Sequence, residues 1–424
     1  MRTARRTATR SAMTTYRLVI GLGGGPLLPA LSFLGRLPTA MCQLGTLLLV
    51  ARTSGSLATA GLVGGALAAG QTVGGPYVGR LADRLGQRPV VLAASLLDAC
   101  AVAALVAAAL GRAPTGALVA LGAAAGLSVP QIGPLARTRT VALARKAGAD
   151  ERTVGAALSL EGTLDEASFV LGPALVGVAA TVAHPAAALA LGAGLLAVCG
   201  TAFAVHPTAR AVAPVRQGAA PVHHGARPRG PYARRGAVHA LRASAALQGA
   251  MFGACQAGIT ALTEELGAPG QSGLVYAAMG VMSAAVGLAM ASVPPSVSLA
   301  ARRRAATGAA LVFALPLPAV DSLVGLYVTV VVLGSAYAPH LITLFALTER
   351  AVPAGRLGES MAYMTSGIIG GQALALAVSG PLAESRGPTA AFAVAVTAAA
   401  CALALALASR DRDRQDRAGA APGR

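Results

Sequence analysis

Long apolar stretches recur along the whole chain and are separated by short polar or charged segments. A membrane-spanning helix needs about 20 mostly apolar residues, and twelve stretches approach that length. We predict spans at 28–50, 57–79, 89–111, 115–136, 155–182, 186–205, 239–262, 272–293, 305–319, 322–345, 359–382 and 388–408. Twelve spans joined by short turns leave no room for a large soluble domain.

The composition agrees with a chain that is surrounded mostly by lipid. Hydrophobic residues make up 55% of the chain and charged residues 12%, whereas a soluble globular protein carries about 25% charged residues. Such a composition excludes disorder, collagen and a disulfide scaffold. The five cysteines are odd in number, lie in apolar stretches and show no metal-ligand spacing, so we predict no bridges and no metal site. The sequence therefore predicts an all-α polytopic membrane protein.

The basic residues are distributed unevenly between the two sides of the predicted spans. A net charge of +18 would suggest nucleic acid for a soluble protein. Here most of the 34 basic residues, including the run from Arg137 to Arg152, fall on one side, and only Arg52, Arg112 and Arg386 fall on the other. The positive-inside rule places both termini in the cytoplasm of a cell-membrane protein, with no nucleic-acid partner.

The longest break between spans divides them into six and six. Residues 207–238 are rich in proline and arginine, which is typical of a linker. We predict a cytoplasmic basic tail (1–27), a six-helix bundle (28–206), the linker (207–238), a second six-helix bundle (239–408) and a cytoplasmic tail (409–424). Met13 is a second candidate start, and no signal-peptide cleavage site follows the first apolar run. Gly172-Pro173 and Gly380-Pro381 occupy matching places in the halves, as in the duplicated units of many secondary transporters.

A glycine-bounded charged loop joins spans two and three. It runs Gly79-Arg80-Leu81-Ala82-Asp83-Arg84-Leu85-Gly86-Gln87-Arg88. It resembles the signature loop of the major facilitator superfamily, G-x-x-x-D-R-x-G-R-[RK], from which only Gln87 departs. The resemblance implies two pseudo-symmetric six-helix bundles, alternating access and a chain that works as a monomer. It also implies that Asp83 faces the N-terminal end of span eleven and latches a gate with Gly79, Arg84, Gly86 and Arg88. An ordinary basic inner loop is the alternative.

Span five carries a second, partial resemblance to the family. Ser159, Ser168, Gly172, Pro173, Val176 and Gly177 fall on the positions of its antiporter motif, G-x8-G-x3-G-P-x2-G-G. Ser168, Gly172, Pro173 and Gly177 are the residues that we carry over, and they favour export. Helix packing through small residues explains them equally well. The stretch 160–173 also resembles predicted drug or metabolite exporters of high-GC Gram-positive bacteria.

Charged residues deep inside the predicted spans are a third signal, and they include Arg36, Asp98, Glu161, Asp165 and Glu166. A buried ion in a membrane is costly, so it usually has a partner and a task. We expect Arg36, Asp98, Glu161 and Asp165 to form one cluster. Our hypothesis is that Asp165 or Glu161 binds and releases a coupling proton, with the proton gradient as energy source and no bound cofactor. A static ion-pair network is the alternative.

Scattered polar residues distinguish the predicted inner spans one, four, seven and ten. They are Gln43, Gln131, Gln256, Tyr337 and His340, our candidates for lining a substrate cavity. His340 is a candidate proton-binding group, because the ordinary pKa of a histidine lies near neutral pH. A structural histidine bonded to a neighbouring helix is the alternative.

These observations favour a proton-coupled antiporter that exports a small molecule. Proton-coupled uptake of a nutrient is the alternative within the transporters. A polytopic membrane enzyme needs a clustered catalytic set that the sequence lacks, and a non-transporting sensor would share the fold. The absence of a G-x4-G-K-[ST] loop excludes intrinsic ATP-driven transport.

Overall fold

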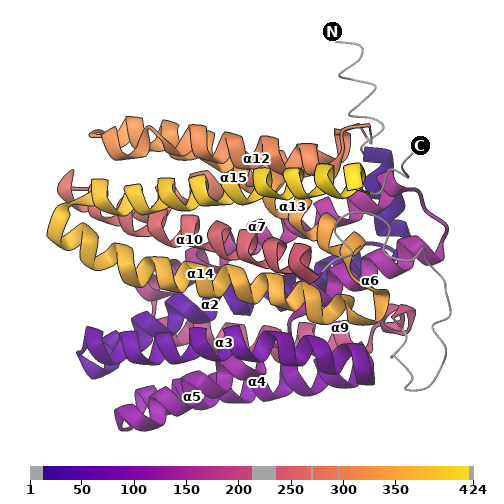
Figure 1. Cartoon of the computed structure of the whole chain (residues 1–424). Helices are drawn as coiled ribbons and strands as arrows, with labels where there is room; N and C mark the ends of the chain where they lie inside the picture. Colours follow the sequence, from indigo (N-terminus) through magenta and orange to yellow (C-terminus); the bar gives the residue numbers. More distant parts are fainter. Residues whose placement is uncertain (1–12, 213–234, 269–270, 295, 420–424) are drawn as a thin grey trace, which may run out of the picture. The chain divides into compact units, whose positions relative to one another are not determined.

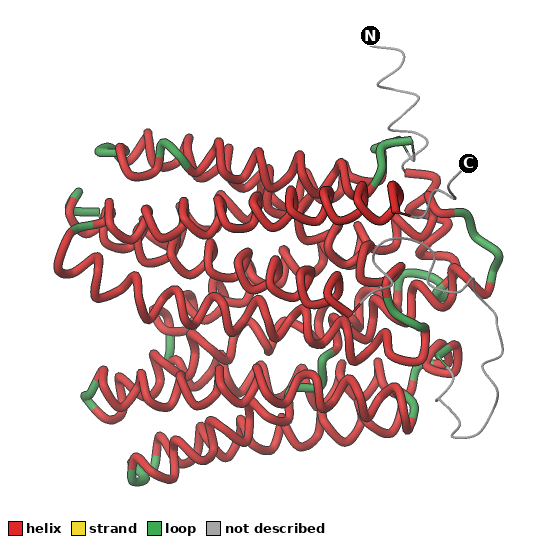
Figure 2. Tube along the Cα trace, viewed as in Figure 1, coloured by secondary structure: helices red, strands yellow, loops and turns green. Residues whose placement is uncertain are grey.

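The computed structural model describes residues 13–212, 235–268, 271–294 and 296–419 of the 424-residue chain. Within these residues the regular elements are all helices, with no strand (Figure 2). The chain packs as two compact units. Unit 1 comprises Met1–Gln217 with Gly355–Ser366, and unit 2 comprises Gly218–Ala354 with Gly367–Arg424.

Unit 1 contains the helices of the first half of the chain. They are α2 (Leu27–Ser54), α3 (Leu57–Leu85), α4 (Gln87–Leu110), α5 (Thr115–Ser128), α6 (Ile132–Lys146), α7 (Glu151–Val182), α8 (Pro185–Leu195), the π-helix η1 (Leu196–Gly200), α9 (Thr201–Val205) and the 3-10 helix η2 (Pro207–Ala211). Residues 13–22 are also helical. Apolar side chains from α2, α3, α4, α5 and α8 form one core cluster, and Figure 1 shows α3, α4 and α5 side by side.

Glycines allow helix α3 to approach two neighbours closely. A Cβ atom on Gly70 would lie 2.6 Å from the carbonyl oxygen of Ala123 on α5, and one on Gly79 would lie 2.8 Å from that of Gly358. Small residues repeated every fourth position let helix backbones come this close in a membrane. Gly70 and Gly79 therefore allow α3 to pack closely against α5 and against the start of α14 (Leu357–Arg386).

Unit 2 contains the remaining helices and most of α14. They are α10 (Arg235–Glu265), α11 (Ser272–Ala289), η5 (Met290–Ser292), α12 (Leu299–Ala314), η6 (Leu317–Ala319), α13 (Leu323–Ala351) and α15 (Pro388–Gly419). The short η7 (Ala354–Arg356) precedes α14. The core of unit 2 gathers fully buried side chains of α10, α11, α12, α13 and α15, among them Met251, Tyr337 and Phe392.

The helices overlap all twelve predicted spans, but several limits were wrong. Nine segments of the described residues are long and apolar enough to cross a membrane, with Thr115–Lys146 and Pro185–Val205 each counted as one; α3, α10 and α12 are not among them. Helix α12 has 16 residues and begins at Leu299, before the predicted 305. Span four is interrupted at residues 129–131, because Pro130 lacks the N–H that a continuous helix needs.

The predicted linker and tails contain helical residues. Residues 207–211 form η2, α10 begins at Arg235, and α15 continues past the predicted end of span twelve at 408. Residues 1–12 of the predicted N-terminal tail, 213–234 of the linker and 420–424 lie outside the described residues.

Candidate functional site

Arg36 of α2 joins two carboxylates of α7 inside unit 1. Glu161 and Asp165 are four residues apart, so they share a face of the helix. The Arg36 guanidinium donates to Oε2 of Glu161 at 2.5 Å and to Oδ1 of Asp165 at 2.6 Å. It also donates to the backbone oxygen of Ser32 at 3.1 Å. These bonds give both carboxyl groups a cationic partner in an interior where an unpaired charge is costly.

Arg137 of α6 completes a network of two positive and two negative side chains. Its guanidinium pairs with Oδ2 of Asp165, and the Thr140 hydroxyl donates to Oε1 of Glu161 at 3.1 Å. The formal charges cancel. The Asp165 side chain is 22% exposed, whereas those of Arg36, Glu161 and Arg137 are 5%, 4% and 1% exposed. Asp165 is therefore the member that a proton reaches most easily.

The burial of Arg137 corrects the sequence analysis, which assigned it to an inner segment after span four. Helix α6 continues to Lys146 and carries Arg137 into the interior. The arginine had been counted as a positive-inside charge. The signal for its burial is that Gly133, Arg137 and Thr140 share one helical face.

Asp98 does not join this network. It is buried on α4 and makes no ion pair or hydrogen bond with any described residue. The prediction that four charged residues form one cluster is therefore wrong for Asp98. Glu166 is buried on α7.

Asp83, at the end of α3, binds the N-terminus of α14. Its Oδ1 accepts from the Gly358 N–H at 3.1 Å, and its Oδ2 accepts from the Glu359 N–H at 2.8 Å. A carboxylate there satisfies unpaired N–H groups and the positive end of the helix dipole. Arg80 adds a hydrogen bond of 2.6 Å to Oε1 of Glu359. The structure thus places Asp83 where the family resemblance implied.

The remaining loop residues differ in their surroundings. Gly86 has a φ of 92°, which favours glycine, at the turn into α4. Arg84 and Arg88 are exposed. Gln87, the departure from the family pattern, is buried and donates to the Leu135 carbonyl and the Thr138 hydroxyl. Sequence reasoning missed Arg80 and Glu359, because a contact across 279 positions has no local signal.

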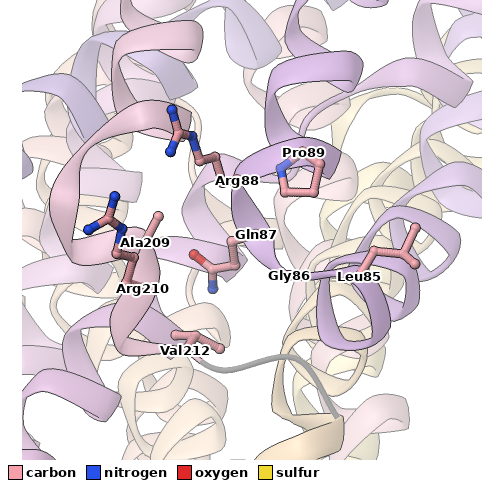
Figure 3. A pocket seen from close by; sticks show the side chains of 8 residues that line it. All are labelled: Leu85, Gly86, Gln87, Arg88, Pro89, Ala209, Arg210 and Val212. Carbon is pink, nitrogen blue, oxygen red and sulfur yellow. The ribbon is translucent and has the colours of Figure 1, made fainter. Parts of the chain in front are cut away.

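A cavity of about 300 Å³ opens beside this turn. It is lined by Leu85, Gly86, Gln87, Arg88, Pro89, Ala209, Arg210 and Val212 (Figure 3). The guanidinium groups of Arg88 and Arg210 lie on the same side in Figure 3. The lining therefore carries positive charge and no acidic side chain.

The residues of the antiporter-like motif lie on α7 with unequal packing. A Cβ atom on Gly172 would lie 2.7 Å from that of Ala40 on α2, whereas one on Gly177 would meet nothing within 4 Å. Ser168 donates to the backbone oxygen of Leu164 in its own helix, and Pro173 lies inside α7. Close packing against α2 explains Gly172, whereas there is space around the Cα of Gly177 for a side chain.

Comparison with known families identifies the chain. The family model described as the Major Facilitator Superfamily matches residues 17–294. The chain belongs to the Major Facilitator Superfamily. It is therefore a multi-pass membrane transporter of small molecules and not an enzyme.

Solved structures of superfamily transporters share the fold over nearly the whole chain. The human organic anion transporter MFSD10 (TETRAN) is 19% identical with a TM-score of 0.66, covering 93% of this chain and 99% of its own. A bacterial homologue of the iron transporter ferroportin, in its outward-facing state, is 17% identical with a TM-score of 0.70, covering 91% and 98%. FucP in the outward conformation is 16% identical, with a TM-score of 0.61 and coverage of 90% and 97%. No curated protein sequence matches significantly.

Two of the residues predicted to line a substrate cavity lie in unit 1. The Gln43 amide on α2 donates to Oε1 of Gln71 on α3 at 3.0 Å. Gln131 is buried at the interruption between α5 and α6, with a φ of 53°. Gln71 was missed because α3 was not counted among the inner spans.

The other three candidates lie in unit 2 and make separate contacts. Gln256 accepts from Gln372 at 3.5 Å. The Tyr337 hydroxyl lies 3.5 Å from Sγ of Cys255, and its ring packs edge-on against Phe252. Nδ1 of His340 lies 2.6 Å from Oε1 of Gln248 on α10, the bond to a neighbouring helix that the structural alternative describes.

Proposed function

We propose that this superfamily transporter is a proton-coupled antiporter that exports a small molecule from the cytoplasm. The observation that carries the proposal is the network of Arg36, Arg137, Glu161 and Asp165 inside unit 1. Its four charges link three helices of one bundle. The chain works as a monomer in the cell membrane, with both termini in the cytoplasm, and the proton gradient supplies the energy.

Asp165 is the residue that binds the coupling proton. In its ionised form, its two oxygens hold Arg36 on α2 and Arg137 on α6. A proton on Asp165 weakens both ion pairs, while Arg36 keeps its bond to Glu161. Breaking a buried ion pair costs about 3–5 kcal/mol. The free-energy change is large enough for protonation to favour a second arrangement of α6 against α7.

Asp83 and Glu359 stabilise one of the two states. The carboxylate of Asp83 holds the first turn of α14, and Arg80 holds Glu359 beside it. These bonds join the end of α3 to α14 and must break if the two helices separate. We propose that they form the cytoplasmic gate.

Export is the direction that the antiporter-like motif of α7 supports. Gly172 lets α7 approach α2, the helix that carries Arg36. One solved relative is described as an organic anion transporter and another as a bacterial homologue of the iron transporter ferroportin. These descriptions name different cargoes, so the substrate proposed below comes from this chain's own residues.

The proposal is tested in everted membrane vesicles that respiration acidifies inside. A pH-sensitive dye reports the gradient while compounds are added one at a time. We expect at least one compound to discharge the gradient in vesicles with the protein and not in vesicles without it. Discharge by no compound, together with accumulation of a nutrient by intact cells that carry the protein, would establish the uptake alternative and overturn export.

A further inference from the structure

The interruption of span four aims a polar side chain into unit 1. Helix α5 ends at Ser128, and α6 begins at Ile132 with Gln131 as its N-cap. A φ of 53° is costly for a residue with a side chain. The Gln131 side chain makes no capping hydrogen bond to α6, so capping does not explain this backbone conformation.

The Gln131 amide lies beside helices α3 and α14. A Cβ atom on Gly75 would lie 3.1 Å from Nε2 of Gln131 and 2.6 Å from Oγ of Ser366. Gly75 thus leaves room on α3 for both side chains. Gln71 lies one helical turn earlier on α3, on the same face, and accepts the hydrogen bond from Gln43 of α2.

Three polar atoms, one each on α2, α3 and α14, have no hydrogen-bond partner among the described residues. They are Nε2 of Gln71, Oγ of Ser366 and Oγ1 of Thr46, which follows Gln43 by three positions on α2. The side chains of all three residues are at least nine-tenths buried. Buried polar groups in native proteins almost always have a partner, so each of these calls for a ligand or a water molecule.

We propose that Gln43, Thr46, Gln71, Gln131 and Ser366, here called the Gln131 site, bind an uncharged hydroxyl or amide group of the exported molecule. The inference rests on the proposed transport function and names its substrate class. All five side chains are amides or hydroxyls, which recognise groups that donate and accept hydrogen bonds without a net charge. A site of this kind rejects analogues that lack the matching polar group, because its buried atoms are then left unpaired.

Helix α6 connects this site to the proton-binding network. Gln131 precedes the first turn, in which a Cβ atom on Gly133 would lie 2.9 Å from Oδ1 of Asp165, and Arg137 follows one turn later. A molecule held by Gln131 and a proton held by Asp165 therefore act on the same 15-residue helix.

Binding is measured by calorimetry on the full chain in lipid nanodiscs without a proton gradient. The uncharged probes are chloramphenicol, uridine and myo-inositol, and the charged probes are tetraphenylphosphonium and benzoate. We expect an uncharged probe to bind most tightly. Ser366→Ala weakens its binding about three- to tenfold, the effect of one neutral hydrogen bond. Ser379→Ala leaves it unchanged, because Ser379 has the same kind of buried, unpartnered hydroxyl on α14 but lies outside the site.

Gln131→Gly separates binding from folding. Glycine adopts the positive φ without strain, so the variant keeps the interruption and at least the thermal stability of the wild type. We expect its affinity for the same probe to fall about tenfold. Binding of only charged probes, of no probe, or equal effects of Ser366→Ala and Ser379→Ala would overturn the proposal and indicate a site for ordered water. None of those binding results prevents a positive vesicle assay, so the proposed transport function can still hold without the Gln131 site. Conversely, a negative vesicle assay with intact binding of the uncharged probe would overturn the proposed transport function and not the site.

Discussion

The two units differ in the charge that their interiors bury. Among the described residues, all the buried acidic side chains lie in unit 1: Asp83, Asp98, Glu161, Glu166 and Glu359. In unit 2 the interior hydrogen bonds include those between the neutral groups Gln248 and His340, and Gln256 and Gln372. Arg303 is buried there and donates to the Ser244 hydroxyl at 2.8 Å.

This difference shows that the two units do not share one interior chemistry. The pair Gly172-Pro173 on α7 has a counterpart in Gly380-Pro381 on α14, yet only α7 carries the carboxylates that pair with Arg36. Charge inside a membrane is costly and persists where it serves a function. We therefore expect unit 1 to respond to protons and unit 2 to respond far less.

The largest expected effect comes from removing Arg36. Arg36→Met leaves the Glu161 carboxylate and Oδ1 of Asp165 without their cation. The free energy of unfolding should therefore fall by about 3–5 kcal/mol. Arg303→Met in unit 2 should cost less, because no buried carboxylate among the described residues of unit 2 loses a cation. The melting midpoints of both variants are measured on heating with a thiol-reactive dye, which reports when the buried Cys42 and Cys255 become exposed.

The control for this prediction is the double variant Arg36→Met with Glu161→Gln. It removes one orphaned carboxylate together with its cation and should recover part of the lost stability. Equal melting midpoints for Arg36→Met and Arg303→Met would contradict the contrast between the two units.

The repeated Gly-Pro pair gives the second comparison. Gly172→Ala should destabilise the protein by about 1–3 kcal/mol, because the added Cβ would lie 2.7 Å from Ala40. Gly380→Ala should not, since its Cβ would meet nothing within 4 Å. Loss of transport by Gly172→Ala at unchanged stability would mean that the motif acts in export and not in packing.

The third comparison tests the contact between the end of α3 and the first turn of α14, both within unit 1. Asp83→Ala removes both acceptors for the N–H groups of Gly358 and Glu359 and should cost about 1–2 kcal/mol. Asp83→Asn keeps one acceptor and should lose less than half of that. The melting midpoints of the two variants check the order, and equal midpoints would show that the charge alone matters.

The smallest expected effect concerns the N-terminus of α7. Asp150 caps it by accepting from the Thr153 N–H at 2.9 Å, and the bonds from Thr153 hold the pKa of Asp150 below its usual value. The cap contributes about 0.5–1 kcal/mol. It is present above the unfolded pKa of about 4 and is lost as the pH falls through the lower folded value. The difference in melting midpoint between wild type and Asp150→Ala should shrink at low pH, and a constant difference would contradict this.

Hydropathy and charge predicted the membrane class and the order of the helices. The loop motif also placed Asp83 beside α14, because a family motif contains a long-range contact that composition does not. Glu161 and Asp165 could be paired with Arg36 from the cost of isolated charge in a membrane.

The contacts that sequence reasoning missed depend on packing between distant helices. Arg137 looked like an ordinary inner-loop arginine until α6 was seen to continue past it. Pro130 signals a break in span four, but no pattern predicts a positive φ at Gln131 or its approach to Gly75 and Ser366. Asp98 was expected in the network because its depth in the membrane matched that of the other charged residues. The spacing along the chain does not show which neighbouring helix its side chain faces.

The central claim, that Asp165 carries the coupling proton, is tested in proteoliposomes made from the purified chain. The compound identified in vesicles is followed in two modes, uptake driven by an imposed pH gradient and exchange without a gradient. Asp165→Asn should keep exchange and lose gradient-driven transport. The matched control, Asp98→Asn, changes another buried carboxyl of unit 1 outside the network and should keep both. Gradient-driven transport by Asp165→Asn at the wild-type rate and pH profile would contradict the account.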